Sequence, residues 1–184
     1  NLESFLGDMW ARSAADIEND MVLTGTGSGQ PQGVIAGGTA GLTLDSGTTV
    51  AAAEIPELFH KLPAAYSQEG DSVAWAMNNA TLGVIRGLAG NPFYYVPTPQ
   101  GERGGNLYGA PVFTSSHILS MAAGRDVIVV GNFQYYGFVE RAGMTVSRNP
   151  WLYQANNQTG FFVDIRFGGA VLVSEAFQYG TNAG

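Results

Sequence analysis

The sequence contains no cysteine and has few charged residues. The lack of cysteine excludes disulfide bonds and metal sites built from thiolates, and it fits a reducing compartment. Asp, Glu, Lys and Arg together form 12% of the 184 residues, which is about half of the usual share. The 8 basic and 15 acidic residues give a net charge of −7, and Lys and Arg form no cluster. Basic clusters drive tight nucleic-acid binding by releasing counterions, so we expect no tight binding to nucleic acid.

The sequence also lacks the segments that direct a chain to a membrane. No apolar run is long enough to span a bilayer, and the start has no basic region followed by an apolar one. The first residue is not Met, so we expect the chain to be a piece of a longer protein. Apolar residues reach 45%, and this share with so little charge indicates that part of the surface contacts other protein.

The first half of the chain predicts helices. Apolar residues three and four positions apart indicate an amphipathic helix over residues 2–24, ended by Gly25. A second helix is expected over residues 55–66, in two pieces because Pro63 cannot continue a helix. A strand is expected over residues 73–77, followed by a helix that Asn78 or Asn79 caps and that Gly90 ends.

The second half of the chain predicts strands. Residues 126–150 indicate two or three strands, separated at Gly131 and at a turn of Ala142 and Gly143. Residues 159–177 indicate two more, broken at Gly168 and Gly169. Helices followed by antiparallel strands favour an α+β fold over a βαβ winding.

A glycine-rich stretch, GTGSGQPQG, covers residues 25–33. A phosphate-binding loop would follow a strand and open a helix, or would end in Gly-Lys-Ser/Thr. Here a helix precedes the glycines and no lysine is near. We therefore interpret the stretch as a bend in which the glycines supply unusual φ values and Pro31 stiffens the exit. Its residues are Gly25, Gly27, Gly29, Pro31 and Gly33.

Residues 44–50, LDSGTTV, match the signature of aspartic proteases, in which two such aspartates share a proton. Because the motif occurs once, a protease would need Asp45 from each chain of a homodimer. Asp, Ser and Gly are also favoured in turns, and the long first helix disagrees with a dimeric, nearly all-β protease. A turn is the favoured interpretation, and the protease remains an alternative.

The chain has two histidines, His60 and His117, and neither has a His or Cys at ligand spacing. Ser115, Ser116 and His117 are adjacent, but triad members meet in space and no Gly-x-Ser-x-Gly elbow is present. We therefore expect no catalytic residue, no cofactor and no metal site.

Five stretches together resemble the major capsid proteins of tailed bacteriophages, the Hong Kong 97 type. They occur in the family's order and cover nearly the whole chain. They are MVLTGTGSGQPQGVI (21–35), AWAMNNATLGVIRGL (74–88), LYGAPVFTSS (107–116), VVGNFQYYGFVERAGMTVSRNP (129–150) and FFVDIRFGGAVLVSEAF (161–177).

The resemblance implies a fold in which a spine helix packs on an antiparallel sheet beside a mixed α/β axial lobe. Residues 1–24 and 143–172 would form the peripheral domain, and residues 25–142 and 173–184 the axial domain. The axial tips would meet around five- and six-fold axes. The protein would be a structural subunit that assembles in the host cytoplasm into pentamers and hexamers of a virion capsid around viral DNA, as in phages and prophages.

The chain departs from the family pattern at its start. The N-terminal arm and the extended loop that clasp neighbouring subunits are absent from the sequence. Some relatives crosslink Lys to Asn with help from a carboxylate. Asn157 and Asp164 stand near the corresponding places, whereas Lys61 is the only lysine. Encapsulins, which are shells with the same fold and a protein cargo, are the alternative within the resemblance.

Overall fold

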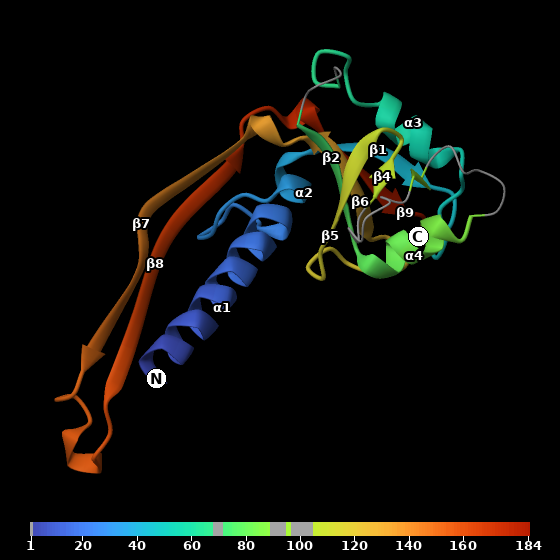
Figure 1. The fold of residues 1–184 in the computed structure, drawn as a ribbon. Coiled ribbons are helices and arrows are strands. Elements are labelled where there is room, and N and C mark those ends of the chain that lie inside the picture. The colour runs from blue at the N-terminus through green and yellow to red at the C-terminus, as the bar shows by residue number, and fades with distance from the viewer. Residues whose placement is uncertain (1, 68–71, 89–94, 97–104) are drawn as a thin grey trace.

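The computed structural model describes residues 2–67, 72–88, 95–96 and 105–184, and it has two visibly different parts (Figure 1). One part is a lobe built on a mixed sheet. The other consists of a long helix and a long β-hairpin that extend away from the lobe on the same side. The N-terminus lies on the extended part and the C-terminus in the lobe. None of the helices that the structure describes is long and apolar enough to cross a membrane.

The long helix α1 spans Leu2–Thr24, as its apolar spacing predicts. It packs against the hairpin through Trp10, whose ring centroid lies 6.0 Å from that of Phe161. Elsewhere on the helix Phe5, Met9 and Ile17 are between 46% and 60% exposed. The helix is therefore only partly covered.

The lobe contains a seven-stranded sheet in the order β1-β9-β6-β2-β5-β4-β3. The pairs β1–β9 and β2–β5 are parallel, and the other pairs are antiparallel. The strands are β1 (Thr39–Leu44), β2 (Val73–Met77), β3 (Tyr95–Val96), β4 (Asn106–Leu107), β5 (Ala110–Thr114), β6 (Asp126–Asn132) and β9 (Phe177–Asn182).

Short helices flank the sheet: α2 (Val34–Gly37), α3 (Glu54–His60) and α4 (Asn79–Arg86). Asn78 caps α4, because its side chain accepts a hydrogen bond from the Ala80 N–H at 2.9 Å. The cap is as predicted, but α4 ends at Arg86, before the expected end at Gly90, which lies outside the described residues. The expected two-piece helix is wrong, since α3 ends at His60 and turns follow it up to Pro63 and beyond.

Each face of the sheet covers its own core, because successive side chains of a strand point to opposite sides. On one face Trp75 and Met77 pack with Leu58 of α3 and Leu82 of α4. The other face carries a second cluster, which lies against α2 and the base of the hairpin. Its buried members are Val34, Ala76, Ile118, Val129, Ala176 and Phe177.

The hairpin consists of β7 (Tyr136–Asn149) and β8 (Gly160–Val171), which pair antiparallel. Three predicted breaks are wrong: Gly131 lies inside β6, Ala142 and Gly143 lie inside β7, and Gly168 and Gly169 lie inside β8. The register shifts between Glu140 and Thr145, so the pattern that predicts a turn there is a β-bulge. The α+β class itself is confirmed.

Candidate functional site

The glycine loop at residues 25–33 carries the chain from α1 to α2. The Gly33 N–H donates to the Gly25 carbonyl at 2.7 Å, and the Gly27 N–H donates to the Pro31 carbonyl at 3.2 Å. Thr26 and Gln32 form an isolated β-bridge between these two bonds. The loop therefore closes on itself and returns the chain to the end of α1.

The glycines of this loop serve two different needs. Gly27 and Gly29 have φ of +79° and +70°, a region that favours glycine. Gly25 and Gly33 are places of close approach instead. A Cβ on Gly33 would lie 2.5 Å from the Gly25 nitrogen, and one on Gly25 would overlap the Pro31 carbonyl oxygen. Unusual φ values therefore account for only half of these glycines.

Gln32 connects the loop to both strands of the hairpin. Its N–H donates to the Gly169 carbonyl of β8 at 2.8 Å, and its carbonyl accepts from the Tyr136 hydroxyl at 2.9 Å. A Cβ on Gly169 would overlap that hydroxyl. Sequence reasoning missed this junction of Gln32, Tyr136 and Gly169. The available signal was Gly169, because glycine inside a strand also marks a close approach.

Replacement of Tyr136 by Phe tests this junction. Removing one hydrogen bond is expected to lower the free energy of unfolding by about 1 kcal/mol near neutral pH.

Burial raises the pKa of the Tyr136 hydroxyl above its usual value of 10.0. Because the folded protein holds the phenol proton more tightly than the unfolded chain does, this group adds stability that is fully present below the unfolded-state pKa. That stability is lost as pH rises through the folded-state pKa. Denaturant unfolding should therefore show a smaller loss of stability above pH 10 in Tyr136→Phe than in the wild type. If the free energy of unfolding fell equally with pH above 10 in both proteins, the burial of this hydroxyl would be contradicted.

His117 joins the lobe to α1. Its Nε2 lies 2.9 Å from the Asp16 carboxylate and its Nδ1 lies 3.5 Å from that of Asp20. His117 follows β5, and both aspartates lie one turn apart on the helix. The expectation that this histidine holds no metal remains a prediction. Within the described part of the chain, no group of three or more His, Asp and Glu could hold one.

The hairpin presents an apolar surface that no described residue covers. The two strands form a sheet of their own, and an isolated two-stranded ribbon is marginally stable in water. Its exposed side chains include Trp151 at 75% and Val139 at 66% exposure. The others above one third exposure are Phe138, Val146, Leu152, Tyr153, Phe162, Val163 and Leu172.

The two residues proposed from the resemblance as a crosslink region lie at different levels of the hairpin. Asn157 follows the turn η2 (Gln154–Asn156) at the tip and has φ +55°. Asp164 lies within β8, opposite Thr145, and is exposed. Lys61 caps α3 in the lobe. No element brings these three residues together.

Asp45 and His60 lie in the lobe. Asp45 is exposed and directly follows β1, and its N–H donates to the buried Glu54 carboxylate at 2.6 Å. Ser46 Oγ accepts from the N–H groups of Thr48 and Thr49, which makes this segment a turn. His60 Nε2 lies 2.9 Å from the Tyr108 hydroxyl.

Comparison with known proteins gives a consistent result. The sequence model described as the Phage capsid family matches residues 1–182. The capsid of an empty GTA particle is 23% identical with a TM-score of 0.83, over 99% of this chain and 66% of that one. The structure of Gordonia phage Cozz is 14% identical with a TM-score of 0.71, over 100% of this chain and 64% of that one. The holo-SrpI encapsulin complex of Synechococcus elongatus PCC 7942 is 11% identical with a TM-score of 0.68, over 95% of this chain and 63% of that one.

These structural likenesses concern the fold, since each identity is below 25%. The chain spans 66% of the length of the GTA capsid chain. Among curated proteins, no sequence matches this chain.

Proposed function

The chain belongs to the phage capsid family, and from this premise we propose that it is a structural subunit of a bacteriophage capsid. Copies associate into pentamers and hexamers, which close into an icosahedral shell around the viral DNA. Heterologous contacts of one chain with the next generate such rings. We assign the subunit no catalytic residue, no cofactor and no metal.

The observation that carries this proposal is the uncovered apolar surface of the hairpin and of α1. A monomeric protein rarely exposes large contiguous apolar patches. Here Trp151, Val139 and Leu172 are each at least 66% exposed, and the whole chain has only 12% charged residues. Burial of such surface releases roughly 25 cal/mol per Å², and many modest interfaces add up in a closed lattice.

We propose that α1 and the hairpin form the peripheral part of the subunit and that the mixed sheet forms the axial part. The boundary expected at residue 143 lies inside β7, which begins at Tyr136. We therefore place the start of the peripheral strands at residue 136. The glycine loop of residues 25–33 then acts as the bend between the two parts.

Further contacts belong to the same proposal. An N-terminal arm and an extended loop of neighbouring subunits would clasp the hairpin and α1. The net charge of −7 fits a container that does not bind its DNA tightly. Assembly would take place in the cytoplasm of the host, and the mature subunit would reside in the virion capsid.

An encapsulin-type shell is the second candidate, favoured by the fold likeness to an encapsulin at a TM-score of 0.68. The aspartic protease has weaker support, because Asp45 lies in an exposed turn on the lobe. Asp45→Asn should therefore leave assembly unchanged.

Sedimentation of the full-length gene product tests the proposal. The expected result is a particle of many subunits, sedimenting far ahead of the free chain, with DNA inside when it is isolated from phage lysates. A particle that holds a packaged enzyme in place of DNA would support the encapsulin. A product that stays monomeric or dimeric at high concentration would overturn both.

A further inference from the structure

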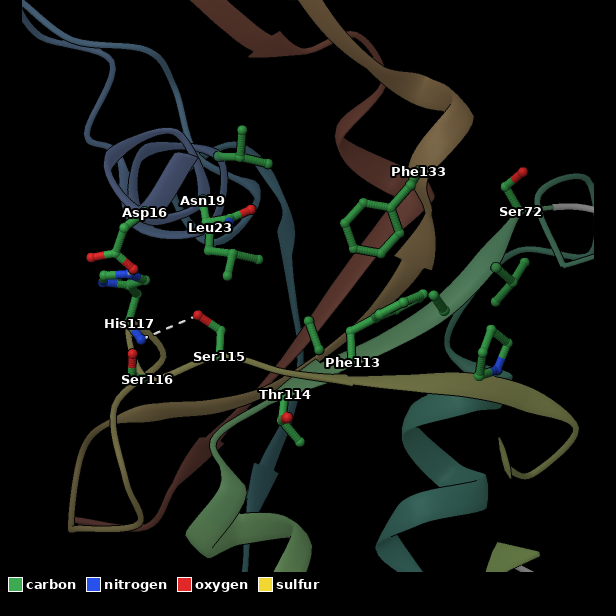
Figure 2. A pocket seen from close by; sticks show the side chains of 15 residues that line it. Asp16, Asn19, Leu23, Ser72, Phe113, Thr114, Ser115, Ser116, His117 and Phe133 are labelled. Atoms are coloured by element: carbon green, nitrogen blue, oxygen red, sulfur yellow. Dashed lines mark hydrogen bonds and ion pairs between the residues drawn. The ribbon is translucent and has the colours of Figure 1, made fainter. Parts of the chain in front are cut away.

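A groove lies between the C-terminal half of α1 and the lobe (Figure 2). Its volume is about 670 Å³, and Leu23 from α1, Phe113 from β5 and Phe133 from the turn after β6 give it an apolar lining. Phe113 is 62% exposed although it lies in a strand of the sheet. At this level, α1 and the lobe therefore face each other across an open space.

The His117 side chain crosses this groove. It points from the lobe toward α1 (Figure 2), with its Nε2 2.9 Å from the Asp16 carboxylate and its Nδ1 3.5 Å from the Asp20 carboxylate. Asp16 lies nine positions before Gly25, which is about 14 Å along a helix at 1.5 Å per residue. The contact therefore joins α1 to the lobe well away from the loop that connects them in the chain.

Both sides of the contact are held in place by their own neighbours. On α1, the Thr24 hydroxyl donates to the Asp20 carboxylate at 2.6 Å. On the lobe, the His117 N–H donates to the Ser115 hydroxyl at 3.2 Å, and the next residue, Ile118, is fully buried in the second cluster. Groups that are ordered before they meet lose little conformational entropy on contact.

The contact with two carboxylates depends on the charge of His117. A neutral imidazole has one N–H group and one acceptor nitrogen, whereas the charged ring has two N–H groups. In the neutral form, one ring nitrogen would present its lone pair to a carboxylate. The charged ring can donate toward both carboxylates and is attracted by both. The complete contact therefore requires the additional proton.

The titratable groups that face His117 are acidic. Among the described residues that line the groove, Asp16 and His117 are the only ones with titratable side chains. Arg12 lies one turn before Asp16 on α1, and the described part of the chain shows no ion pair between these two. Aspartate side chains are ionised above about pH 5, and histidine side chains lose their charge between about pH 5 and pH 8. In this range, the histidine is the partner whose charge changes.

We propose that protonated His117 latches α1 to the lobe through Asp16 and Asp20, and that loss of the proton releases this latch. Because α1 packs on the hairpin through Trp10, the latch sets the angle between the lobe and the extended part. The contact is complete at the acid end of the range and weakens as pH rises. The inference goes beyond the proposed function, since it concerns a single chain and stands whether or not copies form a shell.

The expected effect of the latch is modest. The side chains of Asp16, Asp20 and His117 are 69%, 49% and 21% exposed, and exposed ion pairs are weak. Release is therefore expected to raise the population of chains in which α1 lies away from the lobe by about two- to five-fold. Salt at about 1 M screens exposed charges strongly, so high salt should release the latch as well.

Spin labels on introduced cysteines can measure this angle, because the chain contains no cysteine of its own. Ala11→Cys on α1 and Thr43→Cys on β1 are exposed positions outside the groove. Pulsed electron paramagnetic resonance of the full chain gives the distribution of distances between the two labels at about pH 5.5 and at about pH 8. We expect a displaced population that is about two- to five-fold larger at the higher pH. Addition of about 1 M salt at the lower pH should produce the same population.

His60→Gln is the matched control, because His60 is the other histidine of the chain and contacts the Tyr108 hydroxyl within the lobe. This variant should keep the pH response. His117→Gln should show the larger displaced population at both pH values. The double variant Asp16→Asn, Asp20→Asn should do the same while the histidine stays in place.

Three results would overturn the proposal. One is a wild-type distance distribution that does not change between the two pH values. Another is a pH response that survives in His117→Gln or disappears in His60→Gln. The third is a distribution at the lower pH that high salt leaves unchanged, because the contact would then not be ionic.

Discussion

Gly33→Ala is expected to destabilise the protein by about 3 kcal/mol, a large effect for one methyl group. Gly33 has φ −79°, which alanine adopts readily. The cost is therefore steric and not conformational. The new Cβ would lie 2.5 Å from the Gly25 nitrogen and 2.8 Å from the Leu23 carbonyl oxygen. These are backbone atoms at the end of α1, so the loop must open to relieve the overlap.

Gly7→Ala is the matched control for this prediction. Gly7 lies within α1, and a Cβ there meets nothing within 4 Å. Alanine is expected to stabilise the helix by about 0.5–1 kcal/mol. Denaturant unfolding of the two variants measures the difference. The rate of hydrogen exchange in residues 25–37 should rise for Gly33→Ala only. Equal exchange rates and equal free energies of unfolding in the two variants would contradict the close approach at this loop.

Phe177→Ala is expected to have the second large effect, a loss of about 3–5 kcal/mol. Phe177 is fully buried in the cluster that joins the sheet to α2 and the hairpin base. Its ring meets that of Phe133 edge-on at a centroid distance of 5.5 Å. The neighbours Gly131 and Gly38 lie so near the Phe177 side chain that a Cβ on either would crowd it, and as glycines they have no side chain that could move into the cavity.

Phe162→Ala is the control for Phe177→Ala. Phe162 is 41% exposed on the hairpin, so its truncation should change subunit stability by less than about 1 kcal/mol. Its effect is expected on assembly instead. The two variants are compared by chemical denaturation of the free subunit and by the yield of assembled particles. A Phe177→Ala variant as stable as Phe162→Ala would contradict the second core.

The elements with local causes could be predicted from the sequence. The apolar spacing of α1, the Asn78 cap and the buried run of β2 each depend on neighbours within a few positions, and the structure confirms them. The glycine loop is also visible in the sequence. The close approach that requires Gly33, however, depends on where the chain returns to the end of α1.

Most errors about the strands concern glycine. Gly143, Gly168 and Gly169 suggest breaks, but β7 and β8 continue through them. Glycine marks a turn, a bulge or a close approach, and tertiary contacts decide among these. At Gly169 the deciding contact is the Tyr136 hydroxyl.

The junction and the groove could not be predicted for a related reason. The Tyr136 hydroxyl and the Gln32 carbonyl are 104 positions apart in the chain. His117 and Asp16 are 101 positions apart. No local pattern links such pairs, because sheet order and the direction of the hairpin place them together. From the sequence alone, the exposed Trp151 at the hairpin tip cannot be told from a buried aromatic residue.

Electron cryo-microscopy of the full-length gene product tests most directly whether this chain is a shell subunit. We predict closed polyhedral particles in which the subunits form pentamers and hexamers. In those particles the apolar side chains of the hairpin, Trp151 among them, should be covered by other copies. A single population of monomers or dimers, with the hairpin open to solvent, would contradict the proposal that this surface exists for self-association.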